Sequence, residues 1–203
     1  MPYGQKNYWD QHKDNLTDLG TWYDTTSLDI AVPSYVKDVK SIADLKGKGD
    51  QFDGKIIGIE PGTGQMQLLK NEVVPGYGLD DEYKVVDGST PAMLAELKRA
   101  LAKKEPVAVT LWTPHWAYSE YELTKLEDPK KAFGESNTIR NISSKQFPEQ
   151  YPQFTKWLKN FKMSEDDLGS LEAEIKDRGQ GHEEDAVAAW LEEHPDMVGR
   201  MTP

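Results

Sequence analysis

The chain has 203 residues, of which 37% are hydrophobic and 29% charged, with a formal net charge of -11. This charge argues against nucleic acid as a partner and against an anionic membrane surface, because both need a basic face. The chain has no cysteine, which excludes a disulfide scaffold, a thiolate metal site and a cysteine nucleophile. No stretch approaches the roughly 20 apolar residues of a membrane-spanning helix, and no signal peptide is visible at the amino terminus.

Candidate strands and helices alternate through the first part of the chain, and helices dominate the last part. Short apolar runs predict strands at residues 28–32, 55–60, 83–86, 107–111 and 138–143. Apolar stripes predict helices at residues 3–14, 65–74, 90–101, 148–160, 164–176 and 183–193. Thr90 is the expected N-cap of the third of these helices, with Pro91 in its first turn. The order strand–helix–strand–helix–strand implies right-handed crossovers and a largely parallel sheet.

A loop with two glycines, Glu60-Pro-Gly-Thr-Gly-Gln65, joins the strand at 55–60 to the next helix. Glycines permit a tight turn, and the free amides of a first helical turn suit a carboxylate or a phosphate. The loop lacks the Gly-Lys-Ser/Thr of a P-loop and the full dinucleotide spacing. It is therefore either an ordinary turn or an anion-binding site.

An aromatic cluster, Trp112, His115, Trp116 and Tyr118, follows the apolar strand at 107–111. Such a strand places a large π surface at the carboxyl edge of a sheet, where open α/β sheets bind ligands. The simpler interpretation is that both tryptophans are packing residues. An indole face and free amides at one edge would suit a small zwitterion with a carboxylate and a quaternary ammonium, since aromatic faces hold methylated cations.

Neither histidine motif predicts catalysis or a metal site. A general base needs a nucleophile or an orienting carboxylate within reach, and no triad spacing exists around His115, so we interpret it as a hydrogen-bonded structural residue. The segment His182-Glu-Glu-Asp185 contains metal-ligand residue types, but adjacent positions on a helix do not face one another. We expect no catalytic residue, no metal and no cofactor.

Four segments together resemble the glycine betaine-binding proteins of ABC importers: Lys55–Gly64, Gly88–Met93, Thr110–Trp116 and Leu126–Lys130. The Trp-Thr-Pro-His-Trp and Leu-Glu-Asp-Pro-Lys motifs are the most specific of them, and the similarity covers nearly the whole chain. The resemblance implies a type II periplasmic-binding-protein fold, in which two α/β lobes close on solutes such as glycine betaine or proline betaine. It also implies a membrane permease as partner, an extracytoplasmic location and no enzymatic activity.

The resemblance further implies a ligand site made of aromatic rings and backbone amides. Trp112 matches one tryptophan of the cage around the trimethylammonium, and the N–H groups of Gly64 and Gln65 match those that bind the carboxylate. Thr63 stands where some members have a further cage tryptophan, and Gln5 stands near the place of a ligand-contacting histidine. We also include His115, which is close to Trp112 in sequence. The candidate ligand-binding residues are then Trp112, Gly64, Gln65, Thr63, His115 and Gln5.

The chain departs from the family pattern at its amino-terminal end, where one strand–helix–strand and one cage tryptophan have no match. We therefore expect a remnant of the first lobe and the crossover at residues 1–45, and a complete ligand-binding lobe with a mixed, mostly parallel sheet at 46–135. A return strand and carboxyl-terminal helices should fill residues 136–203. The incomplete lobe could self-associate. The alternative is a truncated or cytoplasmic interaction or sensory domain that uses the same lobe without high-affinity solute binding.

Overall fold

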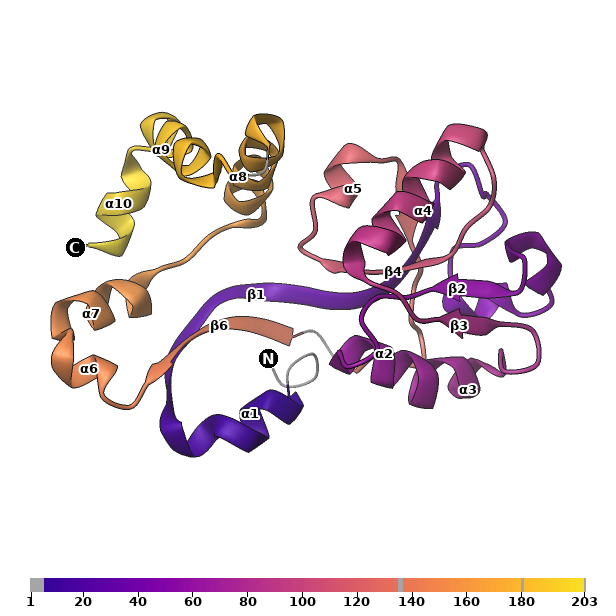
Figure 1. Ribbon diagram of the computed structural model, residues 1–203, viewed down its shortest axis with the longest axis horizontal. Helices are drawn as coiled ribbons and strands as arrows, with labels where there is room; N and C mark the ends of the chain where they lie inside the picture. The colour runs from indigo at the N-terminus through magenta and orange to yellow at the C-terminus, as the bar shows by residue number, and fades with distance from the viewer. Residues whose placement is uncertain (1–5, 135–136, 180, 203) are drawn as a thin grey trace. The chain divides into compact units, whose positions relative to one another are not determined.

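A computed structural model describes residues 6–134, 137–179 and 181–202 of the chain. They form two compact units with separate hydrophobic cores (Figure 1). The α/β unit contains Ser27–Glu135, and the helix-rich unit contains Asn7–Thr26 and Ser136–Pro203. Every helix within the described residues is too short or too polar to cross a membrane.

The α/β unit is built on a mixed sheet with the strand order β3-β2-β4-β1-β5. Its strands are β1 (Leu16–Pro33), β2 (Lys55–Ile57), β3 (Lys84–Val86), β4 (Val109–Thr113) and β5 (Leu123–Lys125). Strand β2 pairs in parallel with β3 and β4, whereas β1 runs antiparallel to β4 and β5. The sheet is therefore parallel at the β3 end and antiparallel at the β5 end.

Helices cover both faces of this sheet. The helical segments are η2 (Ile42–Leu45), η3 (Gly49–Phe52), α2 (Gly64–Leu68), the π-helical turn η4 (Leu69–Val73), α3 (Val74–Tyr77), α4 (Thr90–Lys103) and α5 (Ala117–Glu120). The connection from β2 to β3 and the connection from β3 to β4 cross the sheet in opposite directions. Because both crossovers are right-handed, α2–α3 and α4 lie on opposite faces, as Figure 1 shows.

The core of the α/β unit is apolar and tightly closed around the sheet. Side chains from every layer are fully buried, among them Ile30, Ile56, Met66, Leu97 and Leu111. Gly58, just after β2, allows α2 to pack close to the strand: an added Cβ would lie 2.3 Å from the Met66 Cε and 2.9 Å from the Val86 carbonyl oxygen. A glycine is therefore needed where the chain leaves β2.

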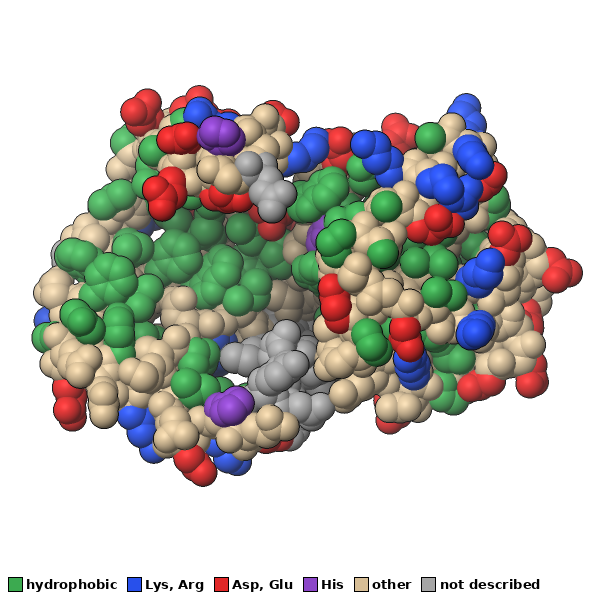
Figure 2. All heavy atoms as spheres, in the orientation of Figure 1, with side chains coloured by type: hydrophobic (Ala, Val, Ile, Leu, Met, Phe, Trp, Pro, Cys, Tyr) green, Lys and Arg blue, Asp and Glu red, His purple; other side chains and the backbone are tan. Residues whose placement is uncertain are grey.

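The helix-rich unit has a two-stranded ribbon, in which β6 (Asn137–Ser144) pairs with the first part of β1. Its helices are α1 (Lys6–His12), α6 (Phe147–Gln150), α7 (Pro152–Asn160), α8 (Glu165–Arg178), α9 (Glu183–Glu193) and α10 (Asp196–Met201). Its core is small and is formed by Tyr23, Met163, Leu168, Trp190 and Met197. Tyr151 and Phe154 are exposed, and Figure 2 shows hydrophobic side chains at the surface over α6 and α7.

The structure corrects three details of the predicted elements. The strand expected at 28–32 is the end of an 18-residue strand that begins at Leu16. The N-cap of α4 is Ser89, whose hydroxyl accepts a hydrogen bond from the Ala92 N–H at 3.3 Å, so Thr90 is the first helical residue. The helix expected at 148–160 divides into α6 and α7 at Tyr151, because Pro152 starts a new helix there.

Candidate functional site

Strands β2 and β4 are parallel neighbours that point to the same edge of the sheet, with Ile57 at the end of β2 opposite Val109 at the start of β4. The loop after β2 leads into α2, and Trp112 is the next-to-last residue of β4. The side chain of Gln65 connects the two, because its Nε2 donates to the Leu111 carbonyl at 2.5 Å and to the Asp29 carbonyl at 3.3 Å. The structure therefore places the start of α2 beside the residue that precedes Trp112.

The first turn of α2 has open backbone amides. Thr63 is the N-cap: its hydroxyl accepts from the Met66 N–H at 3.4 Å and donates to the Glu60 carbonyl at 2.9 Å. Within the described residues, the N–H groups of Gly64 and Gln65 have no hydrogen-bond partner. Free amides at a helix start attract a negatively charged group. Gln65 is buried, and it combines a backbone N–H that is unpaired within the described residues with a side chain that fixes the helix.

The neighbouring helix start, that of α4, is closed by the protein's own carboxylate. Glu60 accepts from the Thr90 N–H at 2.9 Å and from the Thr90 hydroxyl at 3.0 Å. The Thr90 N–H holds the pKa of the Glu60 carboxyl below its ordinary value. Within the described residues, α2 therefore begins with unpaired amides, whereas the Thr90 amide of α4 is paired.

Trp112 is half-buried and supported by His115. The two rings meet edge to face, with centroids 4.5 Å apart and planes at 83°. His115 packs in turn on Trp116, at 5.5 Å between centroids. Its Nδ1 accepts from the Ala117 N–H at 3.0 Å, and burial lowers the pKa of His115 to about 4. The imidazole is therefore neutral at pH 7, with its proton on Nε2, and acts as a structural support for Trp112.

A buried carboxylate that the sequence analysis missed lies in the same region. Asp29 is 4% exposed, and its Oδ2 accepts from the Ser27 Oγ at 3.1 Å, the Thr113 Oγ1 at 3.1 Å and the Tyr118 hydroxyl at 3.2 Å. The Lys125 Nζ lies 3.8 Å from its Oδ1. Burial raises the pKa of Asp29, and Lys125 and the hydroxyls oppose that rise. The sequence signal that could have identified Asp29 is an acidic residue inside the otherwise apolar strand predicted at 28–32.

The Leu-Glu-Asp-Pro-Lys motif has a structural role in this unit. Asp128 accepts from the Tyr77 hydroxyl at 2.6 Å and from the Phe133 N–H at 2.8 Å. The Tyr77 hydroxyl accepts in turn from the Lys130 N–H at 2.9 Å. Burial, with the hydrogen bond to Asp128, raises the pKa of Tyr77 to about 12. The motif therefore fastens the segment after β5 to the end of α3.

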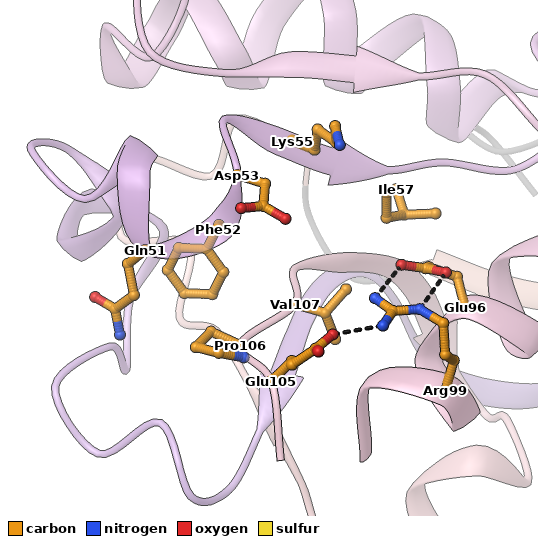
Figure 3. A pocket seen from close by; sticks show the side chains of 10 residues that line it. All are labelled: Gln51, Phe52, Asp53, Lys55, Ile57, Glu96, Arg99, Glu105, Pro106 and Val107. Carbon is orange, nitrogen blue, oxygen red and sulfur yellow. Dashed lines mark hydrogen bonds and ion pairs between the residues drawn. The ribbon is translucent and has the colours of Figure 1, made fainter. Parts of the chain in front are cut away.

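A cavity of about 280 Å³ lies at the opposite edge of the sheet, where β2 begins at Lys55 and the chain enters β4 through Val107 (Figure 3). Arg99 lines this cavity, and its guanidinium is already paired with Glu96 at 2.7 Å and with Glu105 at 2.5 Å. This cavity is separate from the edge that carries Trp112.

Two remaining expectations concern other parts of the chain. Gln5 lies outside the described residues. In the part of the chain that the structure describes, no group of three histidine or acidic side chains is arranged to hold a metal ion. His182 is the N-cap of α9 and precedes its acidic first turn.

Open α/β sheets bind ligands beyond the carboxyl ends of their strands, and in this unit those ends carry Trp112 and the start of α2. Residues 1–193 match the family described as the substrate binding domain of ABC-type glycine betaine transport systems. The chain belongs to this family.

A curated relative and two solved structures agree with this assignment. The glycine betaine/carnitine transport binding protein GbuC of Listeria monocytogenes serotype 1/2a (strain 10403S) is 34% identical over 157 residues, which are 77% of this chain and 52% of the relative. The chain thus spans about half the length of that relative. The glycine betaine/L-proline-binding protein ProX of Borrelia burgdorferi is 32% identical, with a TM-score of 0.87 over 100% of this chain and 76% of that one.

Lactococcal OpuAC, in its closed conformation with glycine betaine, is 28% identical, with a TM-score of 0.89. The match covers 100% of this chain and 77% of that chain. These similarities confirm the predicted type II periplasmic-binding-protein fold with its mixed sheet.

Proposed function

We propose that this protein is the substrate-binding component of an ABC importer for glycine betaine or a related quaternary-ammonium osmolyte. The observation that carries the proposal is the joining of two unlike groups at one sheet edge. Gln65 donates its side-chain amide to the Leu111 carbonyl, which brings the start of α2 next to the residue that precedes Trp112. Unpaired amides and an indole ring would together suit a ligand with a carboxylate at one end and a methylated cation at the other.

The amides of Gly64 and Gln65 would bind the carboxylate. They are unpaired within the described residues, and the start of a helix favours negative charge. The N-cap Thr63 fixes the direction of both amides through its bond to the Met66 N–H. A carboxylate here would replace water with two charge-assisted hydrogen bonds.

Trp112 would bind the quaternary ammonium. A methylated cation cannot donate hydrogen bonds and is attracted to the face of an indole. His115 braces the ring edge to face and is neutral at pH 7, because burial lowers its pKa to about 4. A protonated imidazole beside Trp112 would repel the ligand, so the neutral state favours binding. In the proposal His115 supports the ring and Thr63 the amides.

The proposal includes a membrane permease as partner and an extracytoplasmic location for the protein. Family membership supports both, since the family is described as part of an ABC-type transport system. The net charge of -11 is compatible with a protein that acts near a membrane without adhering to its anionic surface. The protein would deliver a solute and carry out no chemistry on it.

Titration calorimetry with three ligands tests the proposal. Glycine betaine carries both groups, choline carries the ammonium without the carboxylate, and glycine carries the carboxylate without the methyl groups. We expect glycine betaine to bind best, choline to bind more weakly and glycine to give no measurable heat. Equal binding of glycine and glycine betaine would contradict the role of Trp112. The absence of heat with all three would favour an interaction or sensory domain instead.

A further inference from the structure

One carboxylate holds both ends of the turn that follows Trp112. The Oδ2 of Asp29 accepts from the Thr113 hydroxyl at 3.1 Å, immediately after Trp112, and from the Tyr118 hydroxyl at 3.2 Å, in α5. Between these two contacts lie the Thr113-Pro114 peptide and the rings of His115 and Trp116. The turn from β4 into α5 is therefore tied at its beginning and at its end to one atom of β1.

The tether acts from the face of the sheet opposite to the indole. In the β1–β4 pair, Asp29 lies opposite Leu111 and Ser27 opposite Thr113, whereas Leu28 lies opposite Trp112. Side chains alternate between the two faces of a sheet. The Asp29 side chain can thus hold the chain just after Trp112 without covering the ring.

Lys125 keeps the network charged and ordered. Its Nζ lies 3.8 Å from the Asp29 Oδ1 and donates to the Ser27 Oγ at 2.9 Å and to the Thr113 Oγ1 at 3.4 Å. Each hydroxyl that accepts from Lys125 can direct its own proton to Asp29. Burial and the Asp29 charge raise the pKa of Tyr118, so this hydroxyl remains a donor.

A buried carboxylate is a costly way to stabilise a fold, because its desolvation offsets much of what its partners contribute. Backbone pairing already joins β1 to β4 over five residue pairs. The distinctive contribution of the Asp29 side chain is to select a single arrangement of the turn beyond β4. Fixing a binding group in advance reduces the entropy lost on binding.

We propose that Asp29 is a positioning residue for solute recognition. Through Thr113 and Tyr118 it fixes the turn that follows Trp112, and so the orientation of the Trp112 ring. This role rests on the proposed function for its effect on affinity, but the orientation of Trp112 can be observed without any ligand. Asp29 contacts neither the indole nor the α2 amides through its side chain, so it acts through the turn alone.

The test uses the full chain labelled with 5-fluorotryptophan and compares Asp29→Asn, Tyr118→Phe and Ser27→Ala. The chain has six tryptophans, and Trp112→Phe assigns the ¹⁹F signal of Trp112. We expect Asp29→Asn and Tyr118→Phe to shift or broaden that signal. Loss of the Tyr118 hydroxyl in Tyr118→Phe should also weaken glycine betaine binding about fivefold, the equivalent of one hydrogen bond of roughly 1 kcal/mol.

Ser27→Ala is the matched control. It removes a hydroxyl bond to the same Asp29 oxygen, but Ser27 belongs to β1 and not to the turn, so the Trp112 signal should stay in place. Tyr118→Phe keeps its ring and tests the proposal even where Asp29→Asn fails to fold. An unchanged Trp112 signal in Tyr118→Phe, or an equal shift in Ser27→Ala, would overturn the positioning role. If Tyr118→Phe shifts the Trp112 signal but the parent protein binds no solute, the positioning role of Asp29 would be supported and the proposed function contradicted.

Discussion

The imidazole of His115 meets the indole of Trp112 edge to face, 4.5 Å between centroids and at 83°. This arrangement brings the positive edge of one aromatic ring to the negative face of the other, a contact of about 0.5–1.5 kcal/mol beyond area burial. His115 is in turn held by the Ala117 N–H. The ring proposed to bind the solute cation is therefore supported by a residue that is itself hydrogen-bonded to the backbone.

Replacement of Trp112 tests the cation site. Trp112→Leu keeps an apolar side chain but removes the π face, and we expect glycine betaine affinity to fall by about 5- to 30-fold, the equivalent of roughly 1–2 kcal/mol. Titration calorimetry measures the loss. The control is Trp157→Leu, which removes a half-buried tryptophan from α7 in the helix-rich unit. Equal affinity in Trp112→Leu and the parent would remove Trp112 from the site.

Replacement of Gln65 tests the link between α2 and the sheet. Gln65→Leu leaves the carbonyls of Leu111 and Asp29 without their side-chain donor, and an unsatisfied buried polar group costs about 1–3 kcal/mol. Urea denaturation should show that loss of stability. Gln67→Leu alters an exposed glutamine on the same helix and should change the stability much less. A stable Gln65→Leu protein would show that the link is dispensable.

Acidification tests the buried state of His115. Its pKa is lowered to about 4 by burial, whereas an unfolded histidine titrates near 6.5. The unfolded chain therefore binds more protons in this window, and stability should fall as the pH drops from about 6.5 to 4, by at most about 3 kcal/mol.

Urea denaturation at pH 7 and pH 4.5 measures this effect. His115→Asn cannot titrate, and its Oδ1 can accept from Ala117, so its loss of stability between the two pH values should be smaller than in the parent. His182→Asn removes an exposed histidine and should leave the loss as in the parent. An equal loss in His115→Asn and the parent would show that other groups cause it.

A pair of glycine substitutions tests the close packing of α2 on β2. Gly58→Ala would bring a Cβ within 2.3 Å of the Met66 Cε and 2.9 Å of the Val86 carbonyl oxygen, and such overpacking costs about 1–3 kcal/mol. Gly62→Ala meets nothing within 4 Å and should be nearly neutral. Thermal denaturation of the two variants should separate them clearly. Similar midpoints would mean that α2 moves aside at little cost.

Local sequence signals predicted the regular elements well where they were strong. Ser164 was expected to start a helix with acids in its first turn, and it caps α8 through a capping box with Asp167. Glu183–Glu193 is helical over the predicted range. For α8 the cap, the charges and the apolar spacing all favour a helix, and for α9 the acidic first turn and the apolar spacing do, so tertiary contacts had nothing to override.

The first half of β1 could not be predicted in this way. Residues 16–27 are mostly polar, and the strand there depends on pairing with β6, more than 100 residues away in sequence. Gly20 has a φ of 110° at a register shift in this ribbon. From the local sequence alone, a glycine at this position indicates the end of a helix or strand. Strand formation in such a segment is decided by its partner.

The site was predictable at the level of strand ends and less so at the level of side chains. Strand order was enough to place Trp112 and the start of α2 toward one edge, because the carboxyl ends of parallel neighbours point the same way. The buried bonds of Gln65 and the hydroxyls around Asp29 join residues from different elements, and their distances depend on the packed structure. The ligand roles of Trp112, Gly64, Gln65, Thr63 and Gln5 remain predictions.

The division of the chain into two units has a consequence for how such proteins can be recombined. Ser27–Glu135 is one uninterrupted stretch, whereas the helix-rich unit is assembled from Asn7–Thr26 and Ser136–Pro203. A single exchange of the uninterrupted stretch between relatives would therefore transfer Trp112, its Asp29 tether and the α2 amides as one block. The helix-rich unit can be replaced only by changing two separate parts of the gene together.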